Sequence, residues 1–600
     1  MRKKTQAAAA LLCAAMMSPA VTPVAAGADA PSRWAPIDLK RPPAADSVVT
    51  VAGVIEGGEP LEWGGMRVAA GDVNGDGIAD LVVAAPGGTE DRLSRRGRLY
   101  VLLGGVKARP TIDRTVHSLQ KGGVQAATGA GAGLVTQSDI VIDGAGDFDH
   151  FGASLAVADL DADGFADIIA GAPRADGPAD SRPDCGEVWV VHGAAILPPL
   201  IELSAGTGAP ARVNVVSGRV AGGALGTAVA IGDLNADGVA DLVVSAPLAG
   251  GGGGTVGPSN AMNVGEVYVI PTGAGLPPQV DLGAPPEGLL VSAMHGGDAG
   301  DQAGSALAMG DFNGDGTVDL AVGARGGDGP GSHRPESGEV YLVLGARTLP
   351  RFYALGLQAD VFIAPPDIGD LGGGSLAFGD VNGDGRADLI VGAESADGAG
   401  NGKLDAGDVF VLLGRDSGAI EALRPAPAPT ARGKAQTPPT GPVLIDLARP
   451  DVAGLTTIHG ADPGDHTGVR LAVDLDNDGR AEVVLGAEDS SSRRNARGGG
   501  GEARVIPGTA LASATTIDLA RGSRETDEML PVIYGPAGGG HFGKAAVAAD
   551  LNGDGRLELA FSAPQAGQSL SGKVWVLSGD WRTWLTPPVK ETAAVSQGGS

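Results

Sequence analysis

The 600-residue sequence predicts an all-β protein, a seven-bladed β-propeller made of four-stranded blades. One sequence cassette returns seven times, with 69 to 94 residues between successive copies. That spacing is too long for one turn of a solenoid and suits one blade with long loops. Glycine is abundant, at 101 residues, and the apolar runs are short. Both features indicate many strands joined by turns rather than long helices.

The cleanest copy of the cassette spans residues 151–173. It contains a short apolar strand (151–158), an acidic nonapeptide (159–167) and a second apolar strand that ends in an Ala-Pro step (168–173). Apolar runs also follow the other nonapeptides directly, for example at 81–84 and 242–244. Each nonapeptide is therefore expected to be a loop between the first two strands of a blade.

The seven nonapeptides follow the pattern D-x-[DN]-x-D-G-x-x-[DE]. Calcium prefers about 6–8 oxygen ligands from carboxylates, amides and backbone carbonyls. Positions 1, 3 and 5 of a tight loop point inward, position 7 offers its carbonyl, and position 9 closes the site. We therefore predict about seven calcium ions. The expected ligands are Asp72, Asn74, Asp76, Ile78 and Asp80; Asp159, Asp161, Asp163, Phe165 and Asp167; Asp233, Asn235, Asp237, Val239 and Asp241; Asp311, Asn313, Asp315, Thr317 and Asp319; Asp380, Asn382, Asp384, Arg386 and Asp388; Asp474, Asp476, Asp478, Arg480 and Glu482; and Asp550, Asn552, Asp554, Arg556 and Glu558.

Other interpretations of these loops are weaker. A single such nonapeptide could be an ordinary Asp/Asn/Gly turn, but seven copies in register with flanking strands argue against that. The apolar flanks also differ from the helices that surround a helix–loop–helix calcium site. Magnesium is disfavoured because it prefers a small octahedron and keeps its waters.

Two further strands are expected in each repeat. The third strand follows a variable hairpin, as at 186–191, 265–269 and 338–342. A short Ile-Asp-Leu-like segment comes next and is assigned as the fourth strand, at 200–203, 280–282, 444–447 and 516–519.

Closure of the ring is predicted from the two ends of the repeat region. A similar segment, 37–39, precedes the first repeat, whereas the last repeat has no clear copy after 574–577. We therefore expect 37–39 to supply the outer strand of the last blade. Trp581 and Trp584 offer a competing strand.

The cassette resembles the FG-GAP repeat of the integrin α-chain propeller. The Phe-Gly element is literal at 151–152 and 542–543 and degenerate at Trp63-Gly64, Leu225-Gly226, Ala303-Gly304 and Thr467-Gly468. The resemblance implies a seven-bladed propeller with calcium between strands 1 and 2 of a blade. Integrins carry calcium in only some blades, whereas all seven loops here have complete ligand sets.

The ends of the chain suggest a secreted protein. Residues 1–26 have the basic start, apolar stretch and small-residue cleavage site of a signal peptide, and no later segment is apolar enough to span a membrane. Cleavage near Ala26 would leave Cys185 as the only thiol. The propeller is expected over 32–588, with a Pro/Ala-rich insertion at 421–442 and a flexible tail at 589–600.

Composition and motifs exclude several classes of function. The net charge of -28 disfavours nucleic acid and anionic membranes as partners. The eight histidines are scattered, and neither His-Glu-x-x-His nor Gly-x-Ser-x-Gly occurs. No catalytic residue is predicted. Enzymes with this repeat attach it to a separate zinc-dependent domain, for which the repeat region leaves no room.

A ligand-binding face is expected opposite the calcium loops, because the hairpins between strands 2 and 3 emerge there and loops on a rigid scaffold carry specificity. These hairpins are 86–96, 173–185, 247–264, 325–337, 393–406 and 488–500. Ordinary solvated charges are the alternative for their basic residues. The candidates are Arg92, Arg95, Arg174, Arg182, Arg325, His333, Arg334, Arg493 and Arg494.

These observations favour a secreted or surface-exposed, calcium-binding propeller, monomeric, that acts in adhesion or recognition of an extracellular protein or glycan. A carbohydrate-binding lectin is the first alternative. A hydrolase or lyase with its site in the central channel is the second.

Overall fold

The structure is a computed structural model. It describes residues 37–39, 49–57, 64–87, 96–105, 116–119, 139–204, 212–250, 262–424, 441–449, 452–491, 498–520, 530–536, 538–567 and 570–585. The predicted signal peptide and tail, and most of the 421–442 insertion, lie outside the described residues. No described helix is long and apolar enough to cross a membrane.

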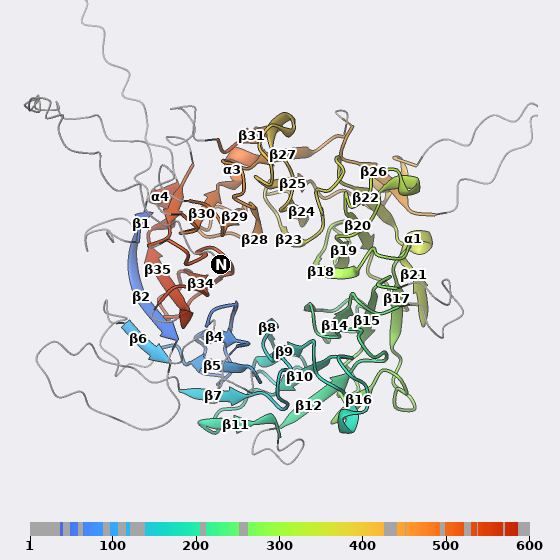
Figure 1. The fold of residues 1–600 in the computed structure, drawn as a ribbon, viewed down its shortest axis with the longest axis vertical. Coiled ribbons are helices and arrows are strands. Elements are labelled where there is room, and N and C mark those ends of the chain that lie inside the picture. Colours follow the sequence, from blue (N-terminus) through green and yellow to red (C-terminus); the bar gives the residue numbers. More distant parts are fainter. Residues whose placement is uncertain are drawn as a thin grey trace, which may run out of the picture.

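Seven β-sheets form a ring around a central axis (Figure 1). The first strands of successive blades contact one another in cyclic order, and β33 contacts β3 to close the circle. The predicted seven-bladed propeller is confirmed. In order from the first strand, the blades are: blade 1, β3 (Arg67–Gly71), β4 (Asp80–Ala85), β5 (Arg98–Leu102), β7 (Ile140–Asp143) and β11 (Leu200–Glu202); blade 2, β8 (Ser154–Ala158), β9 (Asp167–Ala172), β10 (Glu187–Val191), β12 (Val213–Ser217) and β16 (Gln279–Asp281); blade 3, β13 (Val229–Gly232), β14 (Asp241–Ala246), β15 (Glu266–Ile270), β17 (Ser292–His295) and β21 (Phe352–Ala354); blade 4, β18 (Ala303–Gly310), β19 (Asp319–Ala324), β20 (Glu339–Val343), β22 (Val361–Ala364) and β26 (Val443–Asp446); blade 5, β23 (Ser375–Gly379), β24 (Asp388–Ala393), β25 (Asp408–Leu412), β27 (Leu455–His459) and β31 (Thr516–Asp518); blade 6, β28 (Gly468–Val473), β29 (Glu482–Ala487), β30 (Glu502–Ile506), β32 (Val532–Tyr534) and β1 (Ile37–Asp38); and blade 7, β33 (Ala546–Ala549), β34 (Glu558–Ala563), β35 (Lys573–Gly579), β2 (Val49–Gly57) and β6 (Val116–Leu119).

Short helical segments lie in the connections. They are α1 (Leu355–Gln358), α2 (Ser417–Glu421), α3 (Gly508–Leu511) and α4 (Trp581–Leu585), with 3₁₀ turns η1 (Pro178–Asp180), η3 (Pro330–Ser332) and η4 (Ala399–Asn401).

Each blade has four antiparallel strands and a fifth, parallel strand from the following repeat. In blade 1, for example, β11 pairs in parallel with β7, with Leu200 opposite Val141. Figure 1 shows β11 and β6 on the outer rim. The segments at 200–203, 280–282, 444–447 and 516–519 were assigned wrongly as fourth strands, because after strand 3 the chain first crosses to the preceding blade. The true fourth strand comes later in the sequence and pairs antiparallel with strand 3, as β12 does with β10.

The N-terminal segment closes the ring, but through a different strand from the one predicted. β2 pairs antiparallel with β35 from Val49–Gly579 to Glu56–Lys573, and so becomes the fourth strand of blade 7. The predicted 37–39 segment instead joins blade 6, where β1 pairs in parallel with β32. This placement follows the fifth-strand rule of the other blades. The competing strand at Trp581 and Trp584 is the helix α4, whose two indoles are buried.

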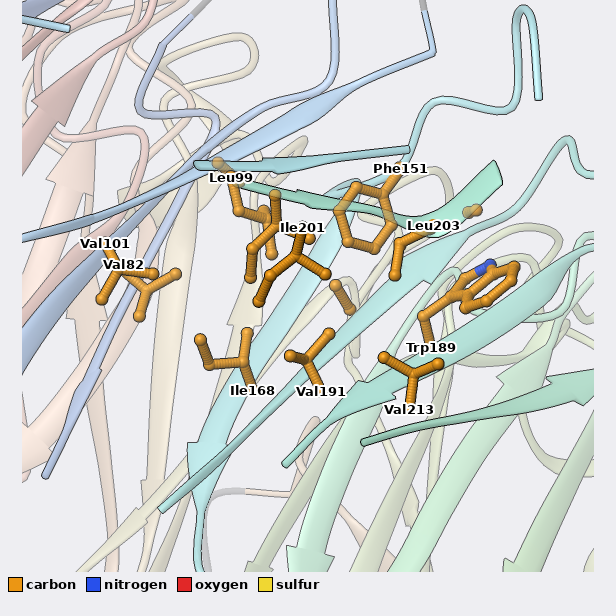
Figure 2. Close-up of a cluster of buried hydrophobic side chains, with 14 of the residues drawn as sticks. Val82, Leu99, Val101, Phe151, Ile168, Trp189, Val191, Ile201, Leu203 and Val213 are labelled. Atoms are coloured by element: carbon orange, nitrogen blue, oxygen red, sulfur yellow. The ribbon is translucent and has the colours of Figure 1, made fainter. Parts of the chain in front are cut away.

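Apolar side chains fill the spaces between blades. In one such cluster, Leu99 and Val101 of blade 1 pack against Ile168, Trp189 and neighbouring residues of blade 2 (Figure 2). Strand 2 of each blade is buried along its whole length, for instance across β4 and β9. A strand covered on both sides reads as a continuous apolar run, which explains the runs that follow the acidic loops.

The Phe-Gly element joins neighbouring blades. Phe151 is 1% exposed and packs in the cluster between blades 1 and 2. A Cβ on Gly97, which precedes strand 3 of blade 1, would lie 2.1 Å from the Phe151 carbonyl oxygen. In blade 1 the equivalent pair is Gly64-Gly65 rather than the predicted Trp63-Gly64, because Gly65 has the positive φ of 89° and Gly64 packs on Gly572.

These pairings predict different results for two N-terminal deletions. Removal of 27–45 takes away only the short β1, so the chain should stay monomeric with a slightly lower melting temperature. Removal of 27–57 also takes away β2 and leaves the edge of β35 unpaired, which favours association with other chains. Light scattering and thermal unfolding of the two proteins provide the measurement. Equal behaviour of the two deletions would contradict closure by β2.

Candidate functional site

The first aspartate of each acidic loop holds the loop in its turn. In loop 1, Asp72 Oδ1 accepts hydrogen bonds from the backbone N–H groups of Gly75 (2.7 Å) and Asp76 (3.0 Å), and Oδ2 accepts one from Gly77 (2.7 Å). The sixth residue donates to the first carboxylate in the same way in all seven loops. Gly77 adopts a φ of 86°, which a side chain would strain. The loops therefore have one shared backbone shape.

The ninth residue is a buried carboxylate that connects the loop to the end of strand 3. In blade 4, Asp319 is fully buried. Its Oδ2 accepts hydrogen bonds from the N–H of Phe312 (2.8 Å) in the loop, and its Oδ1 accepts one from Gly345 (2.8 Å), two residues beyond β20. The N–H of the second loop residue reaches the ninth carboxylate in every blade.

Burial raises the pKa of these ninth carboxyl groups. Desolvation is the largest cause, and the other loop aspartates add repulsion, whereas backbone hydrogen bonds oppose the shift. The pKa of Asp80 rises to about 6, that of Asp319 to about 7 and that of Glu482 to about 8. A buried carboxylate surrounded by other carboxylates favours either a proton or a bound cation.

The donor set of the loops fits a hard cation. In loop 2, Asp159, Asp161 and Asp163 bring carboxylate oxygens within 4.8 Å of one another, and Asp474, Asp476 and Glu482 do the same in loop 6. Two oxygens at the third position, Asp161 Oδ1 and Asn235 Oδ1, are buried without a hydrogen-bond partner. Buried oxygens of this kind are normally satisfied, and a cation in the loop would satisfy them. The structure brings positions 1, 3, 5 and 9 of each loop to the same end of the ring, as predicted from their order between strands 1 and 2.

Neighbouring acidic loops are hydrogen-bonded to each other. The N–H of Ala166 in loop 2 donates to the carbonyl of Asp72 in loop 1 (2.8 Å), and Ala79 in loop 1 donates to Asp550 in loop 7 (3.1 Å). The same contact links Ala387 with Asp311 and Ala481 with Asp380. The first ligand position of one loop is thus attached to the next blade.

The opposite end of the ring carries three hairpins of one shared form, in blades 2, 4 and 5. A basic residue in each hairpin pairs with the aspartate of the fifth strand. Arg182 Nη2 lies 2.6 Å from Asp281, Arg334 Nη1 lies 2.7 Å from Asp446, and Lys403 Nζ lies 2.7 Å from Asp518. The aspartate of the Ile-Asp-Leu segment therefore fastens the borrowed strand to the hairpin. Sequence reasoning missed Lys403 and these pairs, although the spacing D-G-x4-[RK]-x-[DE]-x-G recurs in all three hairpins.

The predicted ligand-binding residues fall into three groups. Arg182 and Arg334 are engaged in the ion pairs above, which gives them a structural role. Arg174, Arg325 and His333 are exposed on the hairpin face. The remaining four, Arg92, Arg95, Arg493 and Arg494, lie outside the described residues.

Charged side chains also meet at the axis on the hairpin side. Arg470 pairs with Glu394 of the preceding blade (2.8 Å), and Lys544 pairs with Glu488 (2.7 Å). Arg67 belongs to blade 1, yet the charges that act on it are Arg470, Glu394 and Glu488 of blades 5 and 6, which do not adjoin blade 1. Burial, followed by Arg470, lowers the pKa of Arg67. Among the described residues, its guanidinium donates only to the Met66 carbonyl and has no ion-pair partner.

Fold and loops together define a seven-bladed β-propeller with an acidic loop in every blade. The FG-GAP repeat model matches six segments of the chain, 64–102, 151–191, 225–258, 303–343, 372–412 and 542–577. The chain is an FG-GAP repeat protein and resembles the integrin α-chain propeller. The matched segments lie in blades 1–5 and 7.

Relatives include both enzymes and integrins. Human phosphatidylinositol-glycan-specific phospholipase D is 38% identical over 30% of this chain and 20% of its own length. Integrin alpha pat-2 of Caenorhabditis elegans is 28% identical over 41% of this chain and 18% of its own length. The chain thus spans about a fifth of these relatives. The Vibrio cholerae biofilm matrix protein Bap1 matches 91% of this chain and 90% of that chain at 12% identity with a TM-score of 0.29, which supports no conclusion.

The two kinds of loop carboxylate should differ when changed. Asp319→Ala leaves buried backbone N–H groups without an acceptor, at about 1–3 kcal/mol each, so the free energy of unfolding should fall even in a chelator. Asp315→Ala, at the exposed fifth position of the same loop, should change it by less than about 1 kcal/mol under those conditions. Urea unfolding at pH 8 in chelator provides the comparison. Equal losses would show that the ninth carboxylate has no structural role of its own.

Proposed function

We propose that this chain is a secreted or surface-exposed, calcium-binding β-propeller that recognises an extracellular protein ligand through its hairpin face. The observation that carries the proposal is the difference between the two ends of the ring. One end has seven acidic loops of a single shape, and the other has hairpins fastened by ion pairs. The predicted signal peptide and the likeness to integrin α chains support an extracellular location.

Calcium is the cation that best suits the loops. The ligands are carboxylate and amide oxygens plus one backbone carbonyl, which a hard cation with flexible geometry accepts. Each loop is already held in its turn by the first aspartate, so binding would require little reordering. Because the ninth carboxylate also organises strand 3 and the first is attached to the neighbouring loop, a cation would stabilise individual blades and the contacts between them.

About seven calcium ions per chain should bind, in competition with protons. In the metal-free protein the raised pKa values mean that the folded state holds protons that the unfolded state loses near pH 4. The melting temperature of that form should therefore fall as pH rises from 5 to 8. Calcium binds the deprotonated loops, so it should raise the melting temperature more at pH 8 than at pH 5.5. Metal analysis and calorimetry test this, and one ion or none per chain would refute it.

The hairpin face is the proposed recognition surface. Arg174, Arg325 and His333 are exposed there and have no ion-pair partner among the described residues, in contrast to Arg182 and Arg334. Hairpins fixed by internal ion pairs can present such side chains without large ordering costs on binding. The resemblance to integrin α chains supports a protein ligand.

An alternative is recognition or hydrolysis of an anionic sugar or phosphodiester at the axis. The observation that favours it is Arg67, a cation near the axis that lacks an ion-pair partner among the described residues. The likeness to proteins named as phospholipases adds weight, but their matched portion is about a fifth of their length.

Binding to immobilised extracellular matrix proteins and to a glycan array, in calcium and in chelator, distinguishes these functions. The proposal predicts calcium-dependent binding to a protein, weakened at least tenfold by the triple variant Arg174→Ala, Arg325→Ala and His333→Ala. Arg351→Ala, an exposed arginine outside the hairpins, is the matched control. Binding to sugars alone, or loss of binding with Arg67→Gln but not with the triple variant, would favour the axial alternative.

A further inference from the structure

Blade 2 differs from the other blades beside its acidic loop. The residue immediately after strand 3 is His192, which is 3% exposed. Strand pairing places Leu103, Pro271, Leu344, Leu413, Pro507 and Ser578 at the equivalent position in the other blades. One loop in seven therefore has a nitrogen ligand available at its buried edge.

The imidazole lies against two of the loop carboxylates. His192 Nδ1 is 3.1 Å from Asp167 Oδ1 and 3.3 Å from Asp161 Oδ2. Metal–ligand bonds of about 2.0–2.2 Å, as zinc makes with nitrogen and oxygen, put neighbouring ligands roughly 3.0–3.5 Å apart. The three atoms are thus spaced as ligands of one small cation would be.

The other ring nitrogen fixes which tautomer faces the loop. His192 Nε2 contacts Asn214 Oδ1. The orientation of that amide is set by its nitrogen, which donates to the carbonyls of Leu276 (2.9 Å) and Pro277 (3.0 Å). The oxygen must then be the acceptor, so Nε2 carries the proton. The lone pair of a neutral His192 consequently points from Nδ1 at two carboxylates, an arrangement that requires a cation between them or a second proton on the ring.

This pattern matches a metal-ligating histidine, which usually donates its other N–H to an oxygen acceptor. A second, independent feature is Asp161 Oδ1, a buried oxygen without a hydrogen-bond partner. Arg212, which is largely exposed, also contacts Asp161 Oδ2 and would compete with a cation there.

We propose that blade 2 holds a mixed nitrogen–oxygen site for a first-row transition metal of the zinc or cobalt class, with His192, Asp161 and Asp167 as ligands and Asn214 as the residue that orients the imidazole. Calcium takes oxygen ligands, whereas imidazole suits zinc, copper, iron and nickel. The other six loops lack a histidine at this position, so the site is unique among the seven. The inference does not depend on ligand recognition by the hairpin face.

The test is a cobalt titration of the full mature chain kept in excess calcium, followed by visible absorption. The expected result is one cobalt ion per chain with the d–d bands of a nitrogen-containing site, displaced by zinc. His192→Gln should abolish the bands, and Asn214→Ala should weaken binding about 10–100-fold through loss of the orienting hydrogen bond.

His459→Gln is the matched control. Its Nδ1 also lies 3.0 Å from a carboxylate, Asp408 Oδ1, but in blade 5 and away from the acidic loops. This variant should leave the cobalt bands unchanged, and circular dichroism should show that both histidine variants are folded. Absence of cobalt bands in the unmodified protein, or bands that survive His192→Gln, would overturn the proposal and leave His192 as a protonated partner of Asp161 and Asp167.

Discussion

The structure depends most on one buried carboxylate per blade, at the ninth position of the acidic loop. Asp319 and its equivalents accept backbone hydrogen bonds from the loop on one side and, in blade 4, from the residue that follows strand 3 on the other. The group thereby fixes the turn between strands 1 and 2 and the exit of strand 3. Hydrogen bonds to a charged acceptor contribute more than neutral ones, yet an unneutralised buried charge is costly. Calcium in the loop resolves this conflict, since it keeps the carboxylate ionised without leaving its charge unbalanced.

The blades are joined by three kinds of contact that originate in the same repeat. The Phe-Gly element packs on the strand-3 glycine of the preceding blade, as Phe151 does on Gly97. The Ile-Asp-Leu segment adds a fifth strand to the preceding blade, and in blades 2, 4 and 5 its aspartate binds a hairpin cation. The acidic loops donate hydrogen bonds from one blade to the next. Closure uses the same contacts, because β2 and β1 supply the fourth strand of blade 7 and the fifth strand of blade 6.

Repetition made the blade count and the positions of the acidic loops predictable, because Asp72 and its six equivalents recur with the same flanking strands. Strand order within a blade was not predictable from local pattern. The segment 200–203 and the true fourth strand 140–143 are both short apolar runs, and only long-range pairing distinguishes them. The ion pair of Arg182 with Asp281 joins residues 99 positions apart, so Arg182 looked free in the sequence. His192 lies 25 residues from Asp167, and its contact with the loop depends on the return of strand 3 beside strand 2.

Hydrogen–deuterium exchange of the mature chain in calcium and in chelator tests the central claim most directly, since it reports where a cation changes backbone opening. The account predicts that calcium slows exchange most in the seven nonapeptides and in the residues that follow strand 3, such as Gly104, Gly345 and Gly414, whose N–H groups bind the ninth carboxylate. The hairpins at 173–185 and 325–337 should change little. Equal exchange in calcium and chelator at the nonapeptides would contradict the account.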